Sequence, residues 1–337
     1  MNPKLRWGIL ATGNIAQVFA DGVRLSRFGT LAAVGSRSLK SARKFAKRFH
    51  VPRAHGRYSD LLKDPEVDAV YIATPHPSHV EWAVKAARAG KHILCEKPIG
   101  MNHGETSRMV KAARKNRVFL MEAFMYRCHP QTGKLVELTR RKTIGDIHLI
   151  QASFGFEAPV DLKNRLFSEK LGGGGILDVG CYPVSVARLV AGTIKGKPFA
   201  DPVEIKGAGR LGKESEVDEY AMAVLKFPGG VTAEISCGIR ALQENNLILH
   251  GSKGTLQVTD PWLPSWQGGF SKILLQKNGG RPQTIIVKSA EGLYAREADH
   301  VAACVRQGLT QSPVMSWNDS LGNMRVLDLW REALEGH

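Results

Sequence analysis

Short apolar runs alternate with amphipathic helical patterns over the first part of the chain. After the apolar run at residues 5–11, Ile15, Val18 and Phe19 recur at the spacing of one helix face. The pattern then predicts, in order, a strand at 30–35, a helix at 39–49, a strand at 67–74, a helix at 79–89, a strand at 91–95, a helix at 106–115 and a strand at 118–122. This alternation is typical of a parallel sheet with helices on both faces.

The pattern changes after Met125, where a mostly helical stretch runs to Thr139. Strands are expected at 148–156, 219–227, 231–237, 246–250, 255–258, 272–276 and 284–287, and helices near 178–190 and at 295–307 and 319–333. Turn signals such as Pro228-Gly229-Gly230 between neighbouring strands favour antiparallel pairing. We therefore predict an α/β protein with an N-terminal Rossmann domain, residues 1–123. The C-terminal α/β domain, residues 124–337, is expected to have a large, open, mainly antiparallel sheet, with its last helices packed back near the first domain.

Bulk composition excludes several classes of protein. A length of 337 residues suits two domains, and a hydrophobic content of 43% does not indicate disorder. No apolar run approaches the roughly 20 residues that span a bilayer, and no signal peptide precedes the first strand. The five cysteines are scattered, without a Cys-x-x-Cys pair, so neither a disulfide framework nor a zinc site is indicated. We expect a cytoplasmic protein that does not act at a membrane.

The net charge of +16 allows two interpretations. It could serve nucleic-acid binding, or it could serve solubility and the attraction of anionic ligands. Lys and Arg are spread along helical stretches such as residues 38–48, and there is no compact basic tail. We therefore favour the second interpretation and expect no nucleic-acid partner.

A turn after the first strand has the spacing of a dinucleotide-binding loop. Residues Ala11-Thr12-Gly13-Asn14-Ile15-Ala16 stand in the place of G-x-G-x-x-G, with alanine at the first and last glycine positions. The turn follows a strand and opens a helix, which is the context that this motif requires. Gly13 would let the backbone approach a pyrophosphate, whose charge the helix N-terminus stabilises. The alternative is an ordinary strand-to-helix turn.

The end of the second strand favours NADP over NAD. An NAD enzyme usually carries Asp or Glu there to bind the ribose 2′-hydroxyl. This chain has Ser36 and Arg37, which leave room for a 2′-phosphate and offer a guanidinium to bind it. Arg37 could instead be a solvated surface charge.

Two clusters could carry the chemistry. Glu96 and Lys97 end the fourth strand, at the sheet edge where ligands of α/β domains bind. Asp178 and Tyr182 follow a glycine run and, at i and i+4, would share one face of an α-helix. An ammonium near Tyr182 would lower the phenol pKa and let it exchange a proton with an alcohol or carbonyl. The alternatives are a surface lysine, a helix-start aspartate and a half-buried aromatic residue.

Together these segments resemble the Gfo/Idh/MocA oxidoreductases, and within that family the dimeric dihydrodiol dehydrogenases, NADP-linked D-xylose dehydrogenases and glucose–fructose oxidoreductase. The resemblance rests on Ala-Thr-Gly-Asn-Ile-Ala, Cys-Glu-Lys-Pro and Gly-Gly-Gly-Ile-Leu-Asp-Val-Gly-Cys-Tyr and runs through nearly the whole chain. It implies that Lys97 and Tyr182 are catalytic, that Asp178 contacts the substrate, and that a cis peptide precedes Pro98. Many relatives carry histidine where this chain has Tyr182.

Several further residues have expected supporting roles. By the resemblance, Thr74 and Pro75 would line the nicotinamide ribose. His79 is expected as a helix-start residue near the cofactor, and Glu96 could orient cofactor hydroxyls. Arg127 and His129 stand where relatives approach the substrate, although either could be a structural hydrogen-bonding residue. Arg165 could reach the cofactor or be a solvated loop residue. The loop with Trp262 and Trp266 could cover the pocket or a subunit contact.

We therefore expect an NADP-dependent oxidoreductase that transfers a hydride between nicotinamide and a carbonyl or hydroxyl carbon of a sugar, sugar derivative or cyclic diol. Tyr182 would move the proton with help from Lys97. No metal is expected, because His76 and His79 lack carboxylate partners. Since relatives cover the open sheet by pairing subunits, a homodimer or a dimer of dimers is expected. The alternatives are an NAD-dependent sugar or inositol dehydrogenase and a non-catalytic dinucleotide-sensing regulator of the same fold.

Overall fold

The first sheet has six parallel strands in the order β3-β2-β1-β4-β5-β6. The computed structural model describes residues 3–335. The strands are β1 (Leu5–Leu10), β2 (Gly29–Gly35), β3 (Arg53–His55), β4 (Ala69–Ile72), β5 (His92–Glu96) and β6 (Leu120–Ala123). The helices between them are α1 (Asn14–Leu25), α2 (Leu39–Phe49), α3 (Tyr58–Leu62), α4 (His79–Arg88) and α5 (His103–Asn116). The order turns outward in both directions from β1 and β4, so a crevice opens at their carboxyl ends.

The second sheet has eight strands in the order β14-β13-β12-β11-β7-β10-β9-β8. They are β7 (Ile147–Gly155), β8 (Glu204–Leu211), β9 (Asp218–Lys226), β10 (Thr232–Gly238), β11 (Leu247–Gly251), β12 (Gly254–Val258), β13 (Gly269–Lys277) and β14 (Gln283–Ser289). The pair β7–β10 is parallel and the other pairs are antiparallel. This confirms the expected mainly antiparallel sheet.

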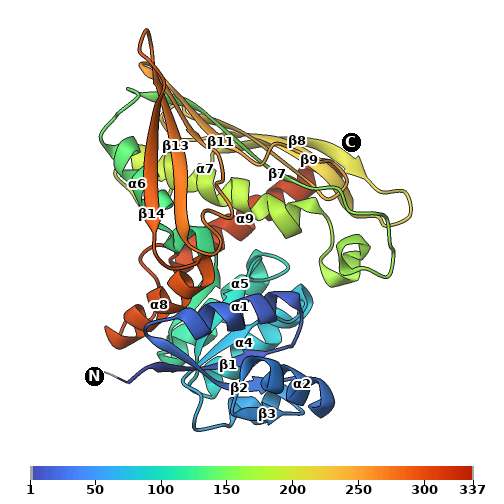
Figure 1. Ribbon diagram of the computed structural model, residues 1–337. Helices are drawn as coiled ribbons and strands as arrows, with labels where there is room; N and C mark the ends of the chain where they lie inside the picture. Colours follow the sequence, from blue (N-terminus) through green and yellow to red (C-terminus); the bar gives the residue numbers. More distant parts are fainter. Residues whose placement is uncertain (1–2, 336–337) are drawn as a thin grey trace.

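Helices cover one face of the large sheet and connect it to the first domain (Figure 1). The helices α6 (Pro130–Arg140), α7 (Cys181–Ile194) and α9 (Trp317–Glu335) lie against the sheet, and α8 (Leu293–Arg306) packs on α1 of the first domain. Both α8 and α9 reach the Rossmann domain: the Asp299 carboxylate of α8 accepts the amide of Phe28 (2.9 Å), and on α9 Trp317 donates its indole N–H to the carbonyl of Leu120 (3.1 Å) and the Asp328 carboxylate accepts the amide of His103 (2.8 Å). The other face of the sheet is open, with Tyr220, Met222 and Val224 exposed on β9.

One helical stretch, Glu169–Ile194, is long and apolar enough by composition to cross a membrane, which the sequence pattern did not indicate. Its apolar window is entirely buried inside the protein. It is therefore the central core helix of the second domain, where a helix that is apolar on all sides is expected.

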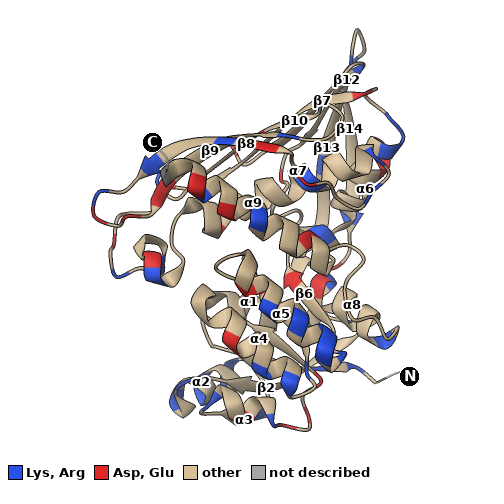
Figure 2. Ribbon diagram, turned by 180° about the vertical axis from the view of Figure 1, so that it is seen from behind, with Lys and Arg blue, Asp and Glu red and all other residues tan. Residues whose placement is uncertain are grey.

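Charged side chains are distributed over both domains (Figure 2). Lys and Arg lie along several helices, including α2 and α5, with acidic residues among them. This distribution suits the interpretation of the net charge as a general positive field.

Candidate active site

The carboxyl ends of the central parallel strands surround one cavity of about 540 Å³. All the residues expected to bind the cofactor line it, with the exception of His79: Ala11, Thr12, Gly13, Asn14, Ile15, Ser36, Arg37, Thr74, Pro75, Glu96, Lys97 and Arg165. Tyr58, Ala73 and His76 complete the lining and were not assigned from the sequence. Ala73 directly follows β4, so its place in the sequence could have indicated that it lines the cavity. Tyr58 lies on α3, a short helix that the sequence pattern did not predict.

The loop after β1 has the features needed to approach a phosphate. Gly13 is the N-cap of α1, and a Cβ built there would meet no atom within 4 Å, so the space in front of the helix N-terminus is free. Ala11 has φ +92°, a conformation that glycine adopts more readily. The amide N–H groups at the start of the 12-residue helix α1 favour an anion there. The loop therefore fits a dinucleotide pyrophosphate.

The adenosine end of the cavity carries a guanidinium and no carboxylate. After β2 ends at Gly35, the buried Ser36 and the exposed Arg37 line the cavity. Burial raises the pKa of Tyr58 and the nearby charge of Arg37 opposes this rise, which places the guanidinium beside the Tyr58 ring. Such a site has room and charge for a 2′-phosphate.

Two neighbouring histidines have different positions. His76 lines the cavity, and its Nδ1 lies 3.1 Å from the carbonyl oxygen of Gly172. His79 is fully buried, with its ring nitrogens 3.0 Å from the Pro98 oxygen and 2.8 Å from the Thr74 oxygen. Burial lowers the pKa of His76 to about 3 and that of His79 to about 4. The carbonyl oxygens of Thr74 and Pro98 oppose this effect of burial at His79. His79 begins α4 and joins two loops that line the cavity, but it does not line the cavity itself.

Lys97 lies where the cofactor cavity meets the second domain. It follows β5, and the Lys97–Pro98 peptide is cis, as the resemblance implied. Its Nζ donates to the carbonyl oxygen of Asp178 (2.6 Å) and lies 3.9 Å from the Asp178 carboxylate. The preceding Glu96 accepts a hydrogen bond from the Tyr71 hydroxyl. The Lys97 ammonium is thus fixed between the two domains.

Asp178 is a buried carboxylate between two cations. Its Oδ1 accepts a hydrogen bond from Arg165 (2.8 Å). Burial alone would raise its pKa, but the charges of Lys97 and Arg165 outweigh burial and hold the pKa below its ordinary value. Nη1 of Arg165 is buried without a hydrogen-bond partner, although Arg165 lines the cavity. A buried guanidinium N–H normally has a hydrogen-bond partner. Nη1 of Arg165 could therefore donate to an oxygen of a bound ligand.

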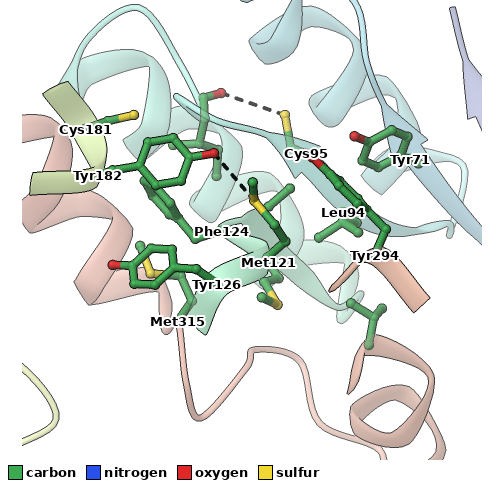
Figure 3. Packing of buried hydrophobic residues seen from close by; sticks show 14 of the residues in the cluster. Tyr71, Leu94, Cys95, Met121, Phe124, Tyr126, Cys181, Tyr182, Tyr294 and Met315 are labelled. Carbon is green, nitrogen blue, oxygen red and sulfur yellow. Dashed lines mark hydrogen bonds between the residues drawn. The ribbon is translucent and has the colours of Figure 1, made fainter. Parts of the chain in front are cut away.

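Tyr182 lies close to Lys97, but its hydroxyl group points elsewhere. Lys97 Nζ is 5.4 Å from the centre of the Tyr182 ring, over its face, while the hydroxyl donates to Sδ of Met125 (3.4 Å). Figure 3 shows Tyr182 packed among buried side chains that include Phe124 and Tyr126. Burial raises the pKa of Tyr182 well above 10. This corrects the expectation that the ammonium lowers the phenol pKa, because the charge faces the ring and not the oxygen. Tyr182 is therefore a neutral phenol.

The turn between Asp178 and Tyr182 also differs from the expected regular helix. Ile176–Gly180 forms a single turn of π-helix, η5, before α7 begins at Cys181. A π turn has more residues than an α turn, so positions i and i+4 do not align on one face. Asp178 consequently faces Lys97 and Arg165, whereas Tyr182 enters an aromatic cluster with Phe124, Tyr126, Phe154 and Trp262.

Two residues expected near the substrate have structural positions. The buried Arg127 pairs with Asp319 (2.6 Å) and also donates to Ser185 and the carbonyl of Val314. The buried His129 caps α6 by accepting the Gln131 amide, and its other nitrogen lies 2.9 Å from Ser265 Oγ. Because these protein contacts engage the polar groups of both side chains, the structure favours the structural alternative for both.

The tryptophan loop belongs to the wall behind Tyr182. Trp262 is 1% exposed, stacks on Phe154 and contacts the Tyr182 ring edge-on. Trp266 is partly exposed and packs on Tyr294. Within residues 3–335, no group of three or more His, Cys, Asp or Glu residues is arranged to bind a metal.

Comparison with known proteins gives consistent matches over the chain. Residues 5–124 match the oxidoreductase family with an NAD-binding Rossmann fold, and residues 133–257 match the GFO/IDH/MocA C-terminal domain. The mouse (Mus musculus) trans-1,2-dihydrobenzene-1,2-diol dehydrogenase is 36% identical over 98% of this chain and 97% of its own length.

Solved structures with the same fold include a 3-ketoreductase and an aldose-aldose oxidoreductase. KijD10, a 3-ketoreductase from Actinomadura kijaniata in complex with NADP and TDP-benzene, has a TM-score of 0.88 at 28% identity. The aldose-aldose oxidoreductase from Caulobacter crescentus, complexed with glycerol, has a TM-score of 0.88 at 25% identity. Each alignment covers 99% of this chain and 98% of the other.

Proposed function

The chain belongs to the Gfo/Idh/MocA oxidoreductase family and is an NAD(P)-dependent oxidoreductase, and from this premise we propose that it uses NADP to interconvert a hydroxyl and a carbonyl group. The proposed substrate is a sugar, sugar derivative or cyclic diol. The observation that carries the proposal is the position of the Lys97 ammonium at the inner end of the cofactor cavity, where Asp178 fixes it. The dihydrodiol dehydrogenase and sugar-oxidoreductase relatives support the substrate class.

Bound NADP would supply the hydride donor or acceptor at C4 of its nicotinamide ring. Lys97 binds and polarises the reacting oxygen, because its ammonium is a strong donor. In the reductive direction, the carbonyl π bond breaks and the oxygen takes the proton of Tyr182 Oη, which regains one from solvent. Burial raises the pKa of Tyr182, so the phenol carries the proton to be donated, and its hydroxyl has to turn from Met125 toward the substrate oxygen to deliver it. The Asp178 carboxylate and Arg165 Nη1 position hydroxyl groups of the bound molecules.

NADP is the proposed cofactor because Ser36 and Arg37, and no acidic residue, follow β2. We further propose a cytoplasmic location, which the five free thiols support, since disulfides are rare in that compartment.

A substrate panel tests the function and the cofactor together. Aldoses, inositols, anhydro-sugars and cyclic diols are offered with NADP or NAD, and absorbance of the reduced nicotinamide is followed. We expect turnover of a sugar or cyclic diol, faster with NADP. Because Arg37→Ala removes the charge expected to hold the 2′-phosphate, it should raise KM for NADP by about tenfold and leave KM for NAD unchanged. No turnover across the panel would refute the function, and equal use of both cofactors would refute the choice of NADP.

We also propose a homodimer through the open sheet face. Met222 and Val224 on β9 are 53% and 48% exposed, and neighbouring apolar side chains of this kind mark association surfaces. Val224→Lys should turn the dimer into a monomer in sedimentation velocity, because it would place a charge in the paired sheets. The control Leu25→Lys, at an exposed site on α1, should remain a dimer. A monomeric native chain would contradict this proposal.

A further inference from the structure

A buried carboxylate on the second sheet supports the turn that carries Asp178. Asp218 is the first residue of β9 and is 7% exposed. Its Oδ2 accepts the amide of Ile176 at 2.6 Å, and the Gly175 amide also interacts with the carboxylate. Ile176 is the first residue of the π turn η5, so Asp218 provides the acceptor for the unpaired amides at the start of that turn.

The glycine run before η5 allows this close approach. Gly174 has φ +96°, and a Cβ at this position would collide with Oδ1 of Asp218. A Cβ at Gly175 would lie 3.2 Å from the Cα of Gly238 and 3.3 Å from Asp218 Oδ2. The backbone of the turn is therefore pressed directly against the carboxylate and the β10 backbone.

The turn fixed in this way connects directly to the reacting groups. The amide of Asp178 donates to the carbonyl of Gly174 (3.1 Å), and the carbonyl of Asp178 accepts from Lys97 Nζ (2.6 Å). The Asp178 carboxylate pairs with Arg165. A chain of short contacts thus runs from Asp218 through the turn to the Lys97 ammonium, while Asp218 itself does not line the cofactor cavity.

We infer that Asp218 is a positioning residue, whose carboxylate holds the Asp178 turn so that Lys97 is fixed at the inner end of the cofactor cavity. The catalytic consequence rests on the proposed function, because it requires that Lys97 binds the reacting oxygen. The positional consequence does not, since it concerns only the contact between Lys97 and Asp178.

The surroundings of Asp218 make its charge sensitive to pH near neutrality. Burial raises the pKa of Asp218 to about 7, although the hydrogen bond from the Ile176 amide and the charge of Arg331 both lower it. The titratable or charged groups around it are Arg331 of α9, Cys237 of β10, and Glu169 and Glu216 of the segments beside it. Protonation of Asp218 leaves the carboxyl group with one fewer acceptor oxygen. The hydrogen bonds from the turn amides to Asp218 therefore weaken below about pH 7 and are fully formed above it.

The test is the reactivity of the Lys97 amine in the NADP-bound enzyme. Trace acetic anhydride labels lysines, and peptide mass spectrometry gives the ratio of Lys97 to the exposed Lys85. In Asp218→Asn, an NH₂ group replaces one acceptor oxygen next to the glycine amides. Because the turn then releases the Lys97 amine, the ratio should rise about fivefold, the factor for losing one hydrogen bond. Displacement of the reacting groups should also lower kcat by up to about 10²-fold, with KM for NADP unchanged.

Glu169→Gln is the matched control, because Glu169 is an exposed carboxylate beside the same small cavity as Asp218. Its labelling ratio and kcat should equal those of the wild type. An unchanged ratio in a folded Asp218→Asn variant overturns the inference. If that variant fails to fold, the wild-type ratio decides: it should be higher at about pH 6 than at about pH 8, and an equal ratio at both overturns the inference. Full turnover in Lys97→Met would refute the proposed mechanism and leave the labelling result standing.

Discussion

Replacing Lys97 by methionine is expected to lower kcat by about 10²- to 10³-fold, the effect of removing one donor to a developing oxyanion. Methionine has a similar length and fits the partly buried site, so the change removes the charge and its hydrogen bond to Asp178 but not the packing. Steady-state kinetics with the best substrate of the panel measures kcat. Fluorescence titration with NADPH should show nearly unchanged binding, because the phosphate and adenosine ends of the cavity are untouched.

Two further variants make the Lys97 result specific. Lys85→Met removes an exposed lysine of α4 that pairs with Glu81, and it should leave kcat unchanged. Tyr182→Phe should remove most turnover, by about 10²- to 10⁴-fold, because it deletes the proton donor. The fold should tolerate it, since the hydroxyl contacts Met125 alone. Wild-type kcat in Lys97→Met, or equal turnover in Tyr182→Phe, would contradict the corresponding role.

Replacing Asp319 by alanine is expected to destabilise the protein by about 3–5 kcal/mol, the range for removing one partner of a buried ion pair. Asp319 pairs with Arg127 at 2.6 Å and with Arg188 at 2.5 Å, and all three side chains are at most 3% exposed. They join the segment after β6 to α7 and α9. Without the Asp319 carboxylate, the buried guanidinium groups of Arg127 and Arg188 would both lack a negatively charged partner that they have in the native protein. Urea unfolding followed by circular dichroism measures the change.

Asp201→Ala provides the control for Asp319. Asp201 also pairs with Arg188, but its side chain is 57% exposed, so its removal should cost about 1 kcal/mol or less. Equal unfolding midpoints for Asp319→Ala and Asp201→Ala would show that the buried network contributes little. A large loss for Asp319→Ala would instead establish that this network supports the packing of the segment after β6 against α7 and α9.

The strongly periodic elements of the fold could be predicted from the sequence, and the weakly periodic ones could not. The apolar strands β1, β4 and β5 are buried by helices on both faces, so they form continuous apolar runs. The missed β3 has three residues. The missed β8 is an edge strand, and most of its side chains are exposed. Because β8 pairs on one side only and exposes most of its side chains, its sequence lacks the alternating apolar pattern.

The sequence also located most of the cofactor cavity. Loops that follow parallel strands gather at one edge of the sheet, so the positions of Gly13, Ser36, Thr74 and Lys97 follow from strand order. Arg127 and His129 show the limit of this reasoning. Both residues are close in the chain to the candidate site, but their partners are distant in the sequence. The Arg127 guanidinium pairs with Asp319, and the His129 imidazole contacts Ser265.

The amino-acid sequence by itself determined the two-domain α/β architecture, the dinucleotide loop and the residue types at the ends of the parallel strands. These properties depend on local periodicity and on the order of elements. Only the tertiary structure decided that the Lys97 ammonium faces the ring of Tyr182 and not its oxygen, that a π turn separates Asp178 from Tyr182, and that Asp218 supports this turn. Side-chain directions of this kind depend on contacts between segments distant in the sequence, which no local pattern encodes.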